Sequence, residues 1–444
     1  MQRLVGMFLI LFSFQAIAGL EKAPPAISVG RDGEKAVFVD FSRAEYEIVY
    51  DIAAGSAWAQ STIWFENKEV GYPIFDLVSE PQSLTVDGVS TTAPLYTIPG
   101  ATKLRYANQL LQPGKHSMSM RHQLSRNVVF SGAQVKSAFW TSDLDDREFL
   151  EQYLPTNMEF DQYKMSLKVV VRGSSTEHEI FTNGEAKVSA SNEWLIEFPE
   201  YFNASSIFFH LTPSSAFRQV NFNYRSIDGR EIPVTIYSTQ SLSSFESRTK
   251  STLAELENDY GAFPHQKVVI YGAGSGGMEY CGATMTSLWA LSHELTHSYF
   301  ARGVMPAAGN AGWIDEAIAS WRDADYRQSS LSSLSPSQMA GHSVYTRMTD
   351  DDAYSKGERF MGYLDRLFTA QGGLKKFLRD LVEKRLFKPM LNEEFKQDLE
   401  LYFNHSLDNE FSKYIMGKKG DKFDYEVANP YHPKLTPSQL LKLL

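Results

Sequence analysis

The sequence contains one cysteine, Cys281, among 444 residues, so an internal disulfide is excluded. A lone thiol with no paired base in view is more typical of a small packed residue than of a nucleophile. We therefore expect Cys281 to lie in a hydrophobic core. Stability has to come from the apolar interior and from any metal that the chain binds.

An excess of basic residues is also missing, because 43 Lys and Arg stand against 53 Asp and Glu and leave a net charge of −10. Short basic patches such as Lys375-Lys376 and Lys418-Lys419 are typical of solvated faces rather than of a binding stripe. The sequence shows no internal repeat either. The composition therefore gives no indication of a nucleic-acid partner.

Long hydrophobic runs are confined to the N-terminus. There, Arg3 precedes an apolar stretch over residues 4–14 and the small-residue sequence Ala16-Ile17-Ala18, a pattern typical of a cleaved export signal. The apolar stretch is short for a membrane span, although an uncleaved anchor is the alternative. We predict a signal peptide over 1–18, cleavage after Ala18, and export to the periplasm or the medium without stable membrane insertion.

The chain does have length and apolar residues. With 43% hydrophobic and 13% aromatic residues it can fill more than one core, so two domains are expected. Strand patterns dominate up to about residue 235 and are strongest at 45–52, 61–65, 164–171, 194–198 and 207–211. A helical pattern over 242–260, a strand over 267–271 and further helices follow. We predict a β-rich domain over 19–231 and a mostly helical domain over 232–444.

Two histidines and a glutamate stand at the spacing of a zinc site. The run His293-Glu294-Leu295-Thr296-His297 puts two imidazoles on one face of a helix. After a gap of eighteen residues, Glu316 can supply a third ligand and leave the fourth tetrahedral position open, as in catalytic zinc sites. Glu294 can then take a proton from an activated water. The pattern indicates metal-assisted hydrolysis with one Zn²⁺ ion.

The surrounding residues favour two helices that meet at this metal. Apolar residues keep a helical spacing over 286–300, where Thr286 or Ser287 can cap the start. After a glycine-containing loop, a second helix over 314–321 carries Glu316 back toward the first. The plainer alternative is a surface helix that holds two histidines by chance, with Glu316 in a salt bridge.

Further polar and glycine residues flank the zinc pattern. Gly276 and Gly277 can let a backbone approach a ligand closely, and Glu279 beside them offers a carboxylate to a cationic group. Downstream, the Tyr354 hydroxyl could stabilise the oxyanion of a tetrahedral intermediate. Plainer roles are also open: Tyr354 could pack at a helix start, and Glu279 could pair with a cation at a strand edge.

With these residues the chain resembles the zinc aminopeptidases typified by aminopeptidase N, which belong to the gluzincin metallopeptidases. The shared features are the HExxH helix, the glutamate in a Trp-x-x-Glu setting, a preceding Gly-x-Met-Glu strand and a following Tyr-x-Lys-Gly helix start. The resemblance is strongest over residues 275–370. It implies an α+β fold, in which an all-β, saddle-like N-terminal domain precedes a mostly helical, thermolysin-like zinc peptidase domain.

The resemblance also implies roles for individual residues around the metal. His293, His297 and Glu316 would bind zinc. Glu294 would act as general base and acid, and Tyr354 would stabilise the transition state.

Substrate contacts follow from the same resemblance. Glu279 would hold the free α-amine of a peptide, while Gly276 and Gly277 would line the substrate backbone. Asp323, seven residues after Glu316, would orient a ligand histidine; local hydrogen bonding alone is the plainer role for it.

The sequence departs from the family pattern in several places. Only fourteen positions separate Glu279 from the first histidine, a shorter segment than usual, and Tyr280 stands where the family has Asn. Residues 299–302 read Tyr-Phe-Ala-Arg instead of Trp-Phe-Gly-Asn. The length leaves no room for a large helical C-terminal domain, so a minimal form with a more open cleft is expected. Asp143 or Asp145 is a candidate for a second acidic group at the amine.

The expected function is removal of N-terminal residues from peptides by a zinc aminopeptidase. A thermolysin-like endopeptidase shares the His-Glu-Leu-Thr-His run, but its third ligand comes one residue later and it lacks the Gly-x-Met-Glu strand. A zinc-containing peptide-binding protein without turnover is the alternative outside the enzymes. Cleavage of an N-terminally blocked peptide would favour the first alternative, and bound zinc without hydrolysis would favour the second.

Overall fold

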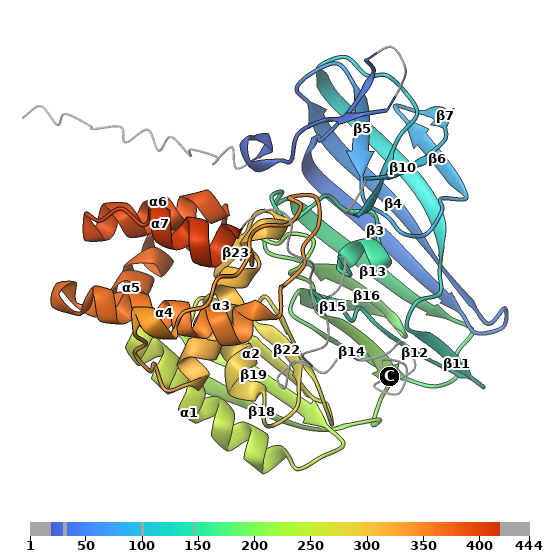
Figure 1. Cartoon of the computed structure of the whole chain (residues 1–444). Coiled ribbons are helices and arrows are strands. Elements are labelled where there is room, and N and C mark those ends of the chain that lie inside the picture. Colours follow the sequence, from blue (N-terminus) through green and yellow to red (C-terminus); the bar gives the residue numbers. More distant parts are fainter. Residues whose placement is uncertain (1–18, 30–32, 99–101, 145–146, 418–444) are drawn as a thin grey trace, which may run out of the picture.

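A computed structural model describes residues 19–29, 33–98, 102–144 and 147–417. It consists of a β-rich half, blue to green in Figure 1, and a second half in which helices cover a smaller sheet, yellow-green to red. The expected α+β organisation, with strands first and helices later, is confirmed. The predicted signal peptide lies outside the described residues, and none of the described helices is long and apolar enough to cross a membrane.

An eight-stranded sheet forms the body of the β-rich half. Its two longest strands, β3 (Asp40–Asp51) and β4 (Ser56–Asn67), pair in antiparallel fashion, and buried and partly exposed residues alternate along β4. Such alternation places one face of a sheet on a core and the other toward solvent. The remaining strands of this sheet are β6 (Ser83–Val86), β7 (Val89–Thr91), β10 (Gly114–Leu124), β13 (Lys164–Arg172), β15 (Glu185–Ala190) and β16 (Glu193–Glu197).

Two smaller sheets close the core of this half. One is five-stranded and contains β1 (Ile27–Ser28), β2 (Lys35–Val37), β5 (Tyr72–Phe75), β8 (Leu95–Thr97) and β9 (Lys103–Tyr106). The other is four-stranded and contains β11 (Val128–Ser131), β12 (Gln134–Ala138), β14 (His178–Thr182) and β17 (Phe209–Pro213). The strands predicted from the sequence correspond to β3, β4, β13, β16 and β17; β3 and β4 begin several residues earlier than predicted, and the other bounds agree within one or two residues.

The second half is built on another five-stranded sheet. Its order is β18 (Arg218–Arg225), β19 (Glu231–Ser238), β20 (Val268–Gly272), β22 (Ala283–Thr286) and β21 (Gly277–Tyr280). The antiparallel partner of β19 is β18, so the domain boundary expected between 231 and 232 falls inside this hairpin. The sheet therefore begins at Arg218, because β18 needs β19 to pair its backbone groups.

Helices cover this sheet and share one hydrophobic core (Figure 1). They are α1 (Leu242–Tyr260), α2 (Leu291–Thr296), α3 (Trp313–Asp323), α4 (Glu358–Leu367), α5 (Gly373–Arg385), α6 (Asn392–Phe403) and α7 (Asp408–Phe411). Two short strands, β23 (Val304–Pro306) and β24 (Lys388–Met390), pair beside them. The predicted helix over 242–260 is confirmed in full, as is the strand near 267–271 within one residue.

The helix predicted over 286–300 is much shorter in the structure. Residues 283–286 form β22, paired with both β20 and β21, and α2 runs only from Leu291 to Thr296. Thr286 does not cap this helix, because it lies four residues before Ala290, the residue that precedes α2, and its hydroxyl donates to the carbonyl oxygen of Ser287 at 2.9 Å. Ser287 instead accepts a hydrogen bond from the backbone N–H of Ala290 at 3.2 Å, which leads the chain into α2.

The two halves meet in an aromatic cluster. Trp140 of the β-rich half stacks on Tyr271 of β20 at 5.7 Å between ring centres, and Phe181 stacks on Tyr237 of β19 at 3.6 Å. His210 lies among these rings and is fully buried. Because aromatic stacking has preferred geometries, this joint holds the sheet of the second half against the first.

Candidate metal centre

Helices α2 and α3 bring the three predicted ligands together. The Nε2 atom of His293 lies 3.0 Å from Oε2 of Glu316, and Nε2 of His297 lies 3.5 Å from the same oxygen. All three side chains are buried, and their ligand atoms lie within 4.8 Å of one another. The four-residue spacing on α2 and the position of Glu316 in the first turn of α3 therefore produce one compact N,N,O group.

The other ring nitrogens have partners of their own, which orient both imidazoles. His293 Nδ1 lies 2.7 Å from Oδ2 of Asp323, and His297 Nδ1 lies 3.1 Å from the carbonyl oxygen of Phe300. With Nδ1 donating in each ring, both Nε2 atoms face Glu316, and each would present its lone pair to a metal ion that displaced the Nε2 proton. Two imidazole nitrogens and one carboxylate form a donor set that suits Zn²⁺, and the residues present fit that ion.

The field at this group attracts cations. Burial by itself would lower the pKa of His297, but the Glu316 and Glu279 carboxylates raise it to about 10. A site that stabilises a positive charge so strongly in its interior is one in which a divalent cation is electrostatically favoured.

Asp323 extends the group outward through a chain of ion pairs. Its second oxygen, Oδ1, accepts from Nη1 of Arg322 at 3.0 Å, and Nε of Arg322 donates to Glu255 of α1 at 2.9 Å. Burial would raise the pKa of Asp323, but the hydrogen bond and charge of His293, together with Arg322, lower it. Asp323 therefore stays ionised behind His293.

Strand β21 passes close over α2 and makes room for Glu294. A Cβ atom added at Gly277 would lie 2.1 Å from Oε1 of Glu294, so only glycine fits against that carboxylate as it lies here. Gly276 precedes it with φ +76°, and its carbonyl oxygen accepts from the backbone of Ser287 at 2.8 Å. The paired glycines therefore bring a backbone close to the carboxylate of Glu294.

Glu279 lies two residues further along β21, on the same side as Gly277, because side chains alternate along a strand. It is buried, and a carboxylate oxygen comes within 4.8 Å of ligand atoms of His297 and Asp315. Its Oε1 atom accepts from Nη2 of Arg302 at 2.9 Å. Burial would raise the pKa of Glu279, but Arg302 and the other nearby cations lower it. Glu279 is thus an anion next to the metal group.

A second buried arginine, Arg347, also borders the group. Nη2 of Arg347 donates to both oxygens of Asp315, at 3.0 and 3.2 Å, and lies 3.5 Å from Oδ2 of Asp143 in the β-rich half. Asp143 also accepts from Thr349 Oγ1 at 2.9 Å, while Asp145 lies outside the described residues. The structure therefore places Asp143 near the group, as an ion-pair partner of Arg347.

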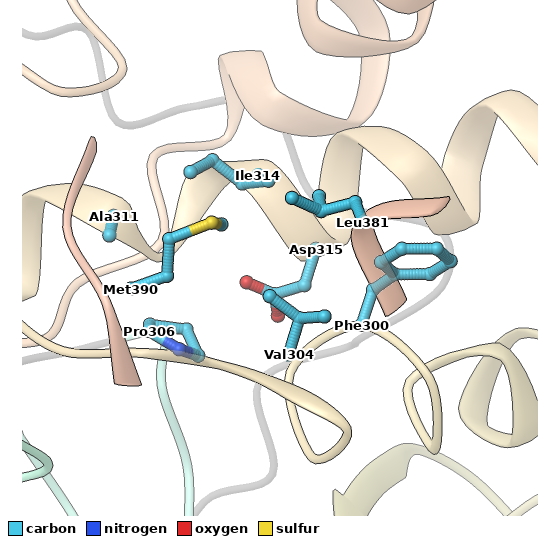
Figure 2. Close-up of a pocket in the computed structure, with 8 residues that line it drawn as sticks. All are labelled: Phe300, Val304, Pro306, Ala311, Ile314, Asp315, Leu381 and Met390. Atoms are coloured by element: carbon cyan, nitrogen blue, oxygen red, sulfur yellow. The ribbon is translucent and has the colours of Figure 1, made fainter. Parts of the chain in front are cut away.

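Asp315 also borders a pocket behind the metal group. Figure 2 shows its carboxylate beside apolar side chains from β23, β24, α3 and α5, among them Ile314, Leu381 and Met390. Burial raises the pKa of Asp315 to about 6, against the opposing effect of Arg347. Asp315 Oδ2 lies 3.6 Å from Nδ1 of His297, the side of the ring that faces away from Glu316. The pocket thus lies behind the ligands.

Tyr354 reaches the group from a single π-helical turn over 353–357, directly before α4. Its ring lies 6.4 Å from that of His293 and is buried. Burial, the charge of Glu316 and a hydrogen bond to it raise the pKa of Tyr354 well above its ordinary value, so the hydroxyl keeps its proton. Gly357 allows this turn to lie against α3, because a Cβ atom there would come within 2.7 Å of the Ala317 side chain.

The predicted residues thus gather around one group: His293, His297, Glu316, Glu294, Glu279, Tyr354, Asp323, Gly276 and Gly277. Sequence reasoning missed Arg302, Arg347 and Asp315 as parts of it. The sequence did set Arg302 apart, because it stands where the family pattern has Asn. Cys281 is buried as expected, and burial raises the pKa of its thiol to about 12, which leaves it inert.

Comparison with known proteins identifies solved structures that share this fold. Neither a protein-family model nor a curated protein sequence matches the chain. Among solved structures, an M1 zinc metallopeptidase from Deinococcus radiodurans is 13% identical, with a TM-score of 0.58, and the match covers 82% of this chain and 91% of that one. A mutant of that enzyme bound to a Tyr-Ser-Ala substrate gives a TM-score of 0.59 at 14% identity, covering 83% and 92%.

A third match is aminopeptidase A of Legionella pneumophila in complex with aspartic acid. It is 13% identical with a TM-score of 0.64, and the match covers 87% of this chain but 50% of that longer one. These likenesses show that the chain has the fold of the M1 zinc metallopeptidases over more than four fifths of its length.

Proposed function

We propose that the protein is a zinc aminopeptidase that hydrolyses N-terminal residues from peptides. The observation that carries this proposal is the convergence of His293, His297 and Glu316, with Glu294 beside them. The M1 zinc metallopeptidase fold supports it. Export through the predicted signal peptide is part of the proposal.

Zn²⁺ would be held by Nε2 of both histidines and by the Glu316 carboxylate. When bound, the ion polarises a carbonyl and lowers the pKa of water toward about 7. The Nδ1 partners, Asp323 and the Phe300 carbonyl, would hold the two imidazoles in the correct tautomer.

The chain's own residues then supply the proton transfers. Glu294 would take a proton from the attacking water and pass it to the nitrogen of the leaving amine, as general base and then general acid. Tyr354 keeps its hydroxyl proton because burial and Glu316 raise its pKa, so it can donate a hydrogen bond to the oxyanion of the tetrahedral intermediate.

Peptides with a free amine are the proposed substrates. Glu279, an anion beside the ligand group, supports recognition of the ammonium, and Gly276 and Gly277 would line the peptide backbone. A related fold carries a bound Tyr-Ser-Ala substrate and others carry single amino acids, which supports a peptide or amino-acid ligand here.

The proposal is tested with aminoacyl fluorogenic substrates, matched N-acetylated peptides and a metal chelator. We expect hydrolysis of the free-amine substrates, loss with chelator, and recovery on adding zinc. Replacing Glu294 with Gln should abolish turnover while zinc content stays at one ion per chain, because the ligands are untouched. Full activity of Glu294→Gln would refute the mechanism.

The same assay separates the alternatives. Internal cleavage of the acetylated peptides would indicate an endopeptidase of the thermolysin type. Stoichiometric zinc with no hydrolysis of any free-amine peptide would instead indicate a peptide-binding protein.

A further inference from the structure

Arg302 is a buried arginine whose three nitrogens all have fixed partners. Nε donates to the backbone carbonyl oxygen of Glu279 at 3.2 Å, and Nη2 donates to Oε1 of the same residue at 2.9 Å. Nη1 donates to the hydroxyl of Ser205, which belongs to the β-rich half. A guanidinium that bonds both the main chain and the side chain of one residue fixes how that side chain turns.

The second carboxylate oxygen of Glu279 has no such partner. Oε2 is buried, and no described residue donates a hydrogen bond to it. A buried charged oxygen without a donor is costly, so the site is complete only when a donor arrives. The carboxylate lies within 4.8 Å of a ligand atom of His297, so that donor would belong to a molecule bound at the metal group.

We propose that Arg302 is a positioning residue for the amine of the substrate. It donates hydrogen bonds to Oε1 and to the backbone carbonyl oxygen of Glu279. These two contacts hold the side chain in one orientation, with Oε2 directed at the ammonium group. This inference rests on the proposed aminopeptidase function. It assigns amine recognition to a clamped pair, Arg302 with Glu279, rather than to a free carboxylate.

The positive charge of Arg302 makes orientation the main contribution of the pair. An ammonium at Oε2 gains from Glu279 but is repelled by the nearby guanidinium, so a loosely placed carboxylate would bind it weakly. Glu316, whose charge also acts on Glu279, supplies further negative charge nearby. The amine therefore binds at Oε2 of Glu279, where the oriented oxygen and the surrounding negative charge both favour it.

The test measures how strongly the enzyme prefers a substrate that has an α-amine. The probes are the best aminoacyl 4-nitroanilide and its des-amino analogue, which differs only by the missing amine. Loss of one charge-assisted hydrogen bond should lower the ratio of their kcat/KM values about ten- to a hundredfold in Glu279→Gln. Arg302→Lys keeps the charge but not the two-pronged contact, so it should lower the ratio to a similar extent, through a higher KM of the aminoacyl substrate.

Arg302→Met shows whether Arg302 matters because it orients Glu279 or because its positive charge repels the amine. Arg366→Met, on the exposed face of α4, is the matched control. We expect Arg302→Met to lose the preference, and the double variant Glu279→Gln/Arg302→Met to lose no more than Glu279→Gln alone. If Arg302→Met leaves a buried charge and fails to fold, the double variant and Arg302→Lys decide the question.

A binding measurement makes the test independent of turnover. In the zinc-loaded Glu294→Gln background, calorimetry with an amino-acid amide and its des-amino analogue should show the same loss of preference for Arg302→Lys. A preference equal to wild type in Arg302→Lys, or a greater one in Arg302→Met, would overturn the inference. Absence of any aminoacyl hydrolysis by the wild type would instead refute the proposed function itself.

Discussion

Asp323 orients His293, one of the three candidate metal ligands. Its carboxylate bonds Nδ1 of His293 at 2.7 Å and is held in turn by Arg322 and Glu255. The ring of His293 can therefore neither rotate nor change tautomer without breaking this chain. At the scale of single residues, the geometry of the candidate metal site therefore includes such supporting contacts as well as the three candidate ligands.

Replacing Asp323 with Asn should weaken zinc binding about ten- to a hundredfold, because the neutral amide no longer supports the charge and tautomer of His293. Competition with a chromophoric chelator measures this affinity. Asp325→Asn is the control: Asp325 is exposed two residues further on, at φ +56°, a conformation that Asn also adopts. An unchanged zinc affinity in Asp323→Asn would show that the contact is only structural.

The residues of the site could be predicted to different extents. His293, His297 and Glu316 follow from local helical spacing and one return loop. The roles of Arg302 and Arg347 could not be derived, since their partners Glu279 and Asp143 lie 23 and 204 positions away and only the fold makes them neighbours.

At the scale of elements, the site depends on how closely α3 and the 353–357 turn approach. The turn carries Tyr354 and the helix carries Glu316, and Gly357 sits at their contact. The Tyr-x-Lys-Gly pattern in the sequence included this glycine but did not show why a glycine is needed there. The structure supplies it, because a side chain at Gly357 would meet Ala317.

Gly357→Ala should destabilise the protein by about 1–3 kcal/mol and lower kcat, because the added methyl overpacks the contact and shifts Tyr354 away from Glu316. Chemical denaturation and steady-state kinetics check both effects. The double variant Gly357→Ala/Ala317→Gly moves the methyl group from one side of the contact to the other and should recover part of each loss. Wild-type stability of the single variant would mean that the contact relaxes at no cost.

Element boundaries near the site were harder to predict than the elements themselves. The apolar spacing over 286–300 is helical in period, yet α2 covers only Leu291–Thr296, and Thr286 belongs to β22, which pairs with β20 and β21. By contrast, α1 has the expected bounds since Gly261, at φ +100°, ends it locally.

At the scale of the whole molecule, the aromatic joint makes the fold sensitive to acid. Burial lowers the pKa of His210 to about 3, and His265 in the second half is lowered to about 3 as well, again mainly by burial. In the unfolded chain a histidine takes up its proton near pH 6.5. Below that pH the unfolded state binds protons that the folded state excludes, so stability falls as pH falls from about 6.5 toward 3.

His210→Gln should reduce this loss. Each excluded proton costs about 1.4 kcal/mol per pH unit, so the wild type should lose about 2 kcal/mol more than the variant between pH 7.5 and 5.0. Unfolding free energies at the two pH values measure the difference, with the exposed His405→Gln as control. Equal losses in wild type and His210→Gln would show that His210 is protonated in the folded state.

The order of a β-rich half and a helical half could be predicted from the change in hydrophobic periodicity along the chain. The joint could not, since its pairs, such as Trp140 with Tyr271, bring together residues from both halves. The expected boundary at 231 was placed at a change of pattern, and such a pattern carries no sign of the backbone pairing between β18 and β19 across it.

Two arginines of the second half find partners in the first: Arg302 bonds Ser205, and Arg347 pairs with Asp143. A recombination event that exchanged one half for a distant homologue's would leave these guanidinium groups stranded in the interior. The same holds for a gene fragment that encodes the second half alone. Substitution within the intact chain keeps these pairs, whereas shuffling of its parts breaks them.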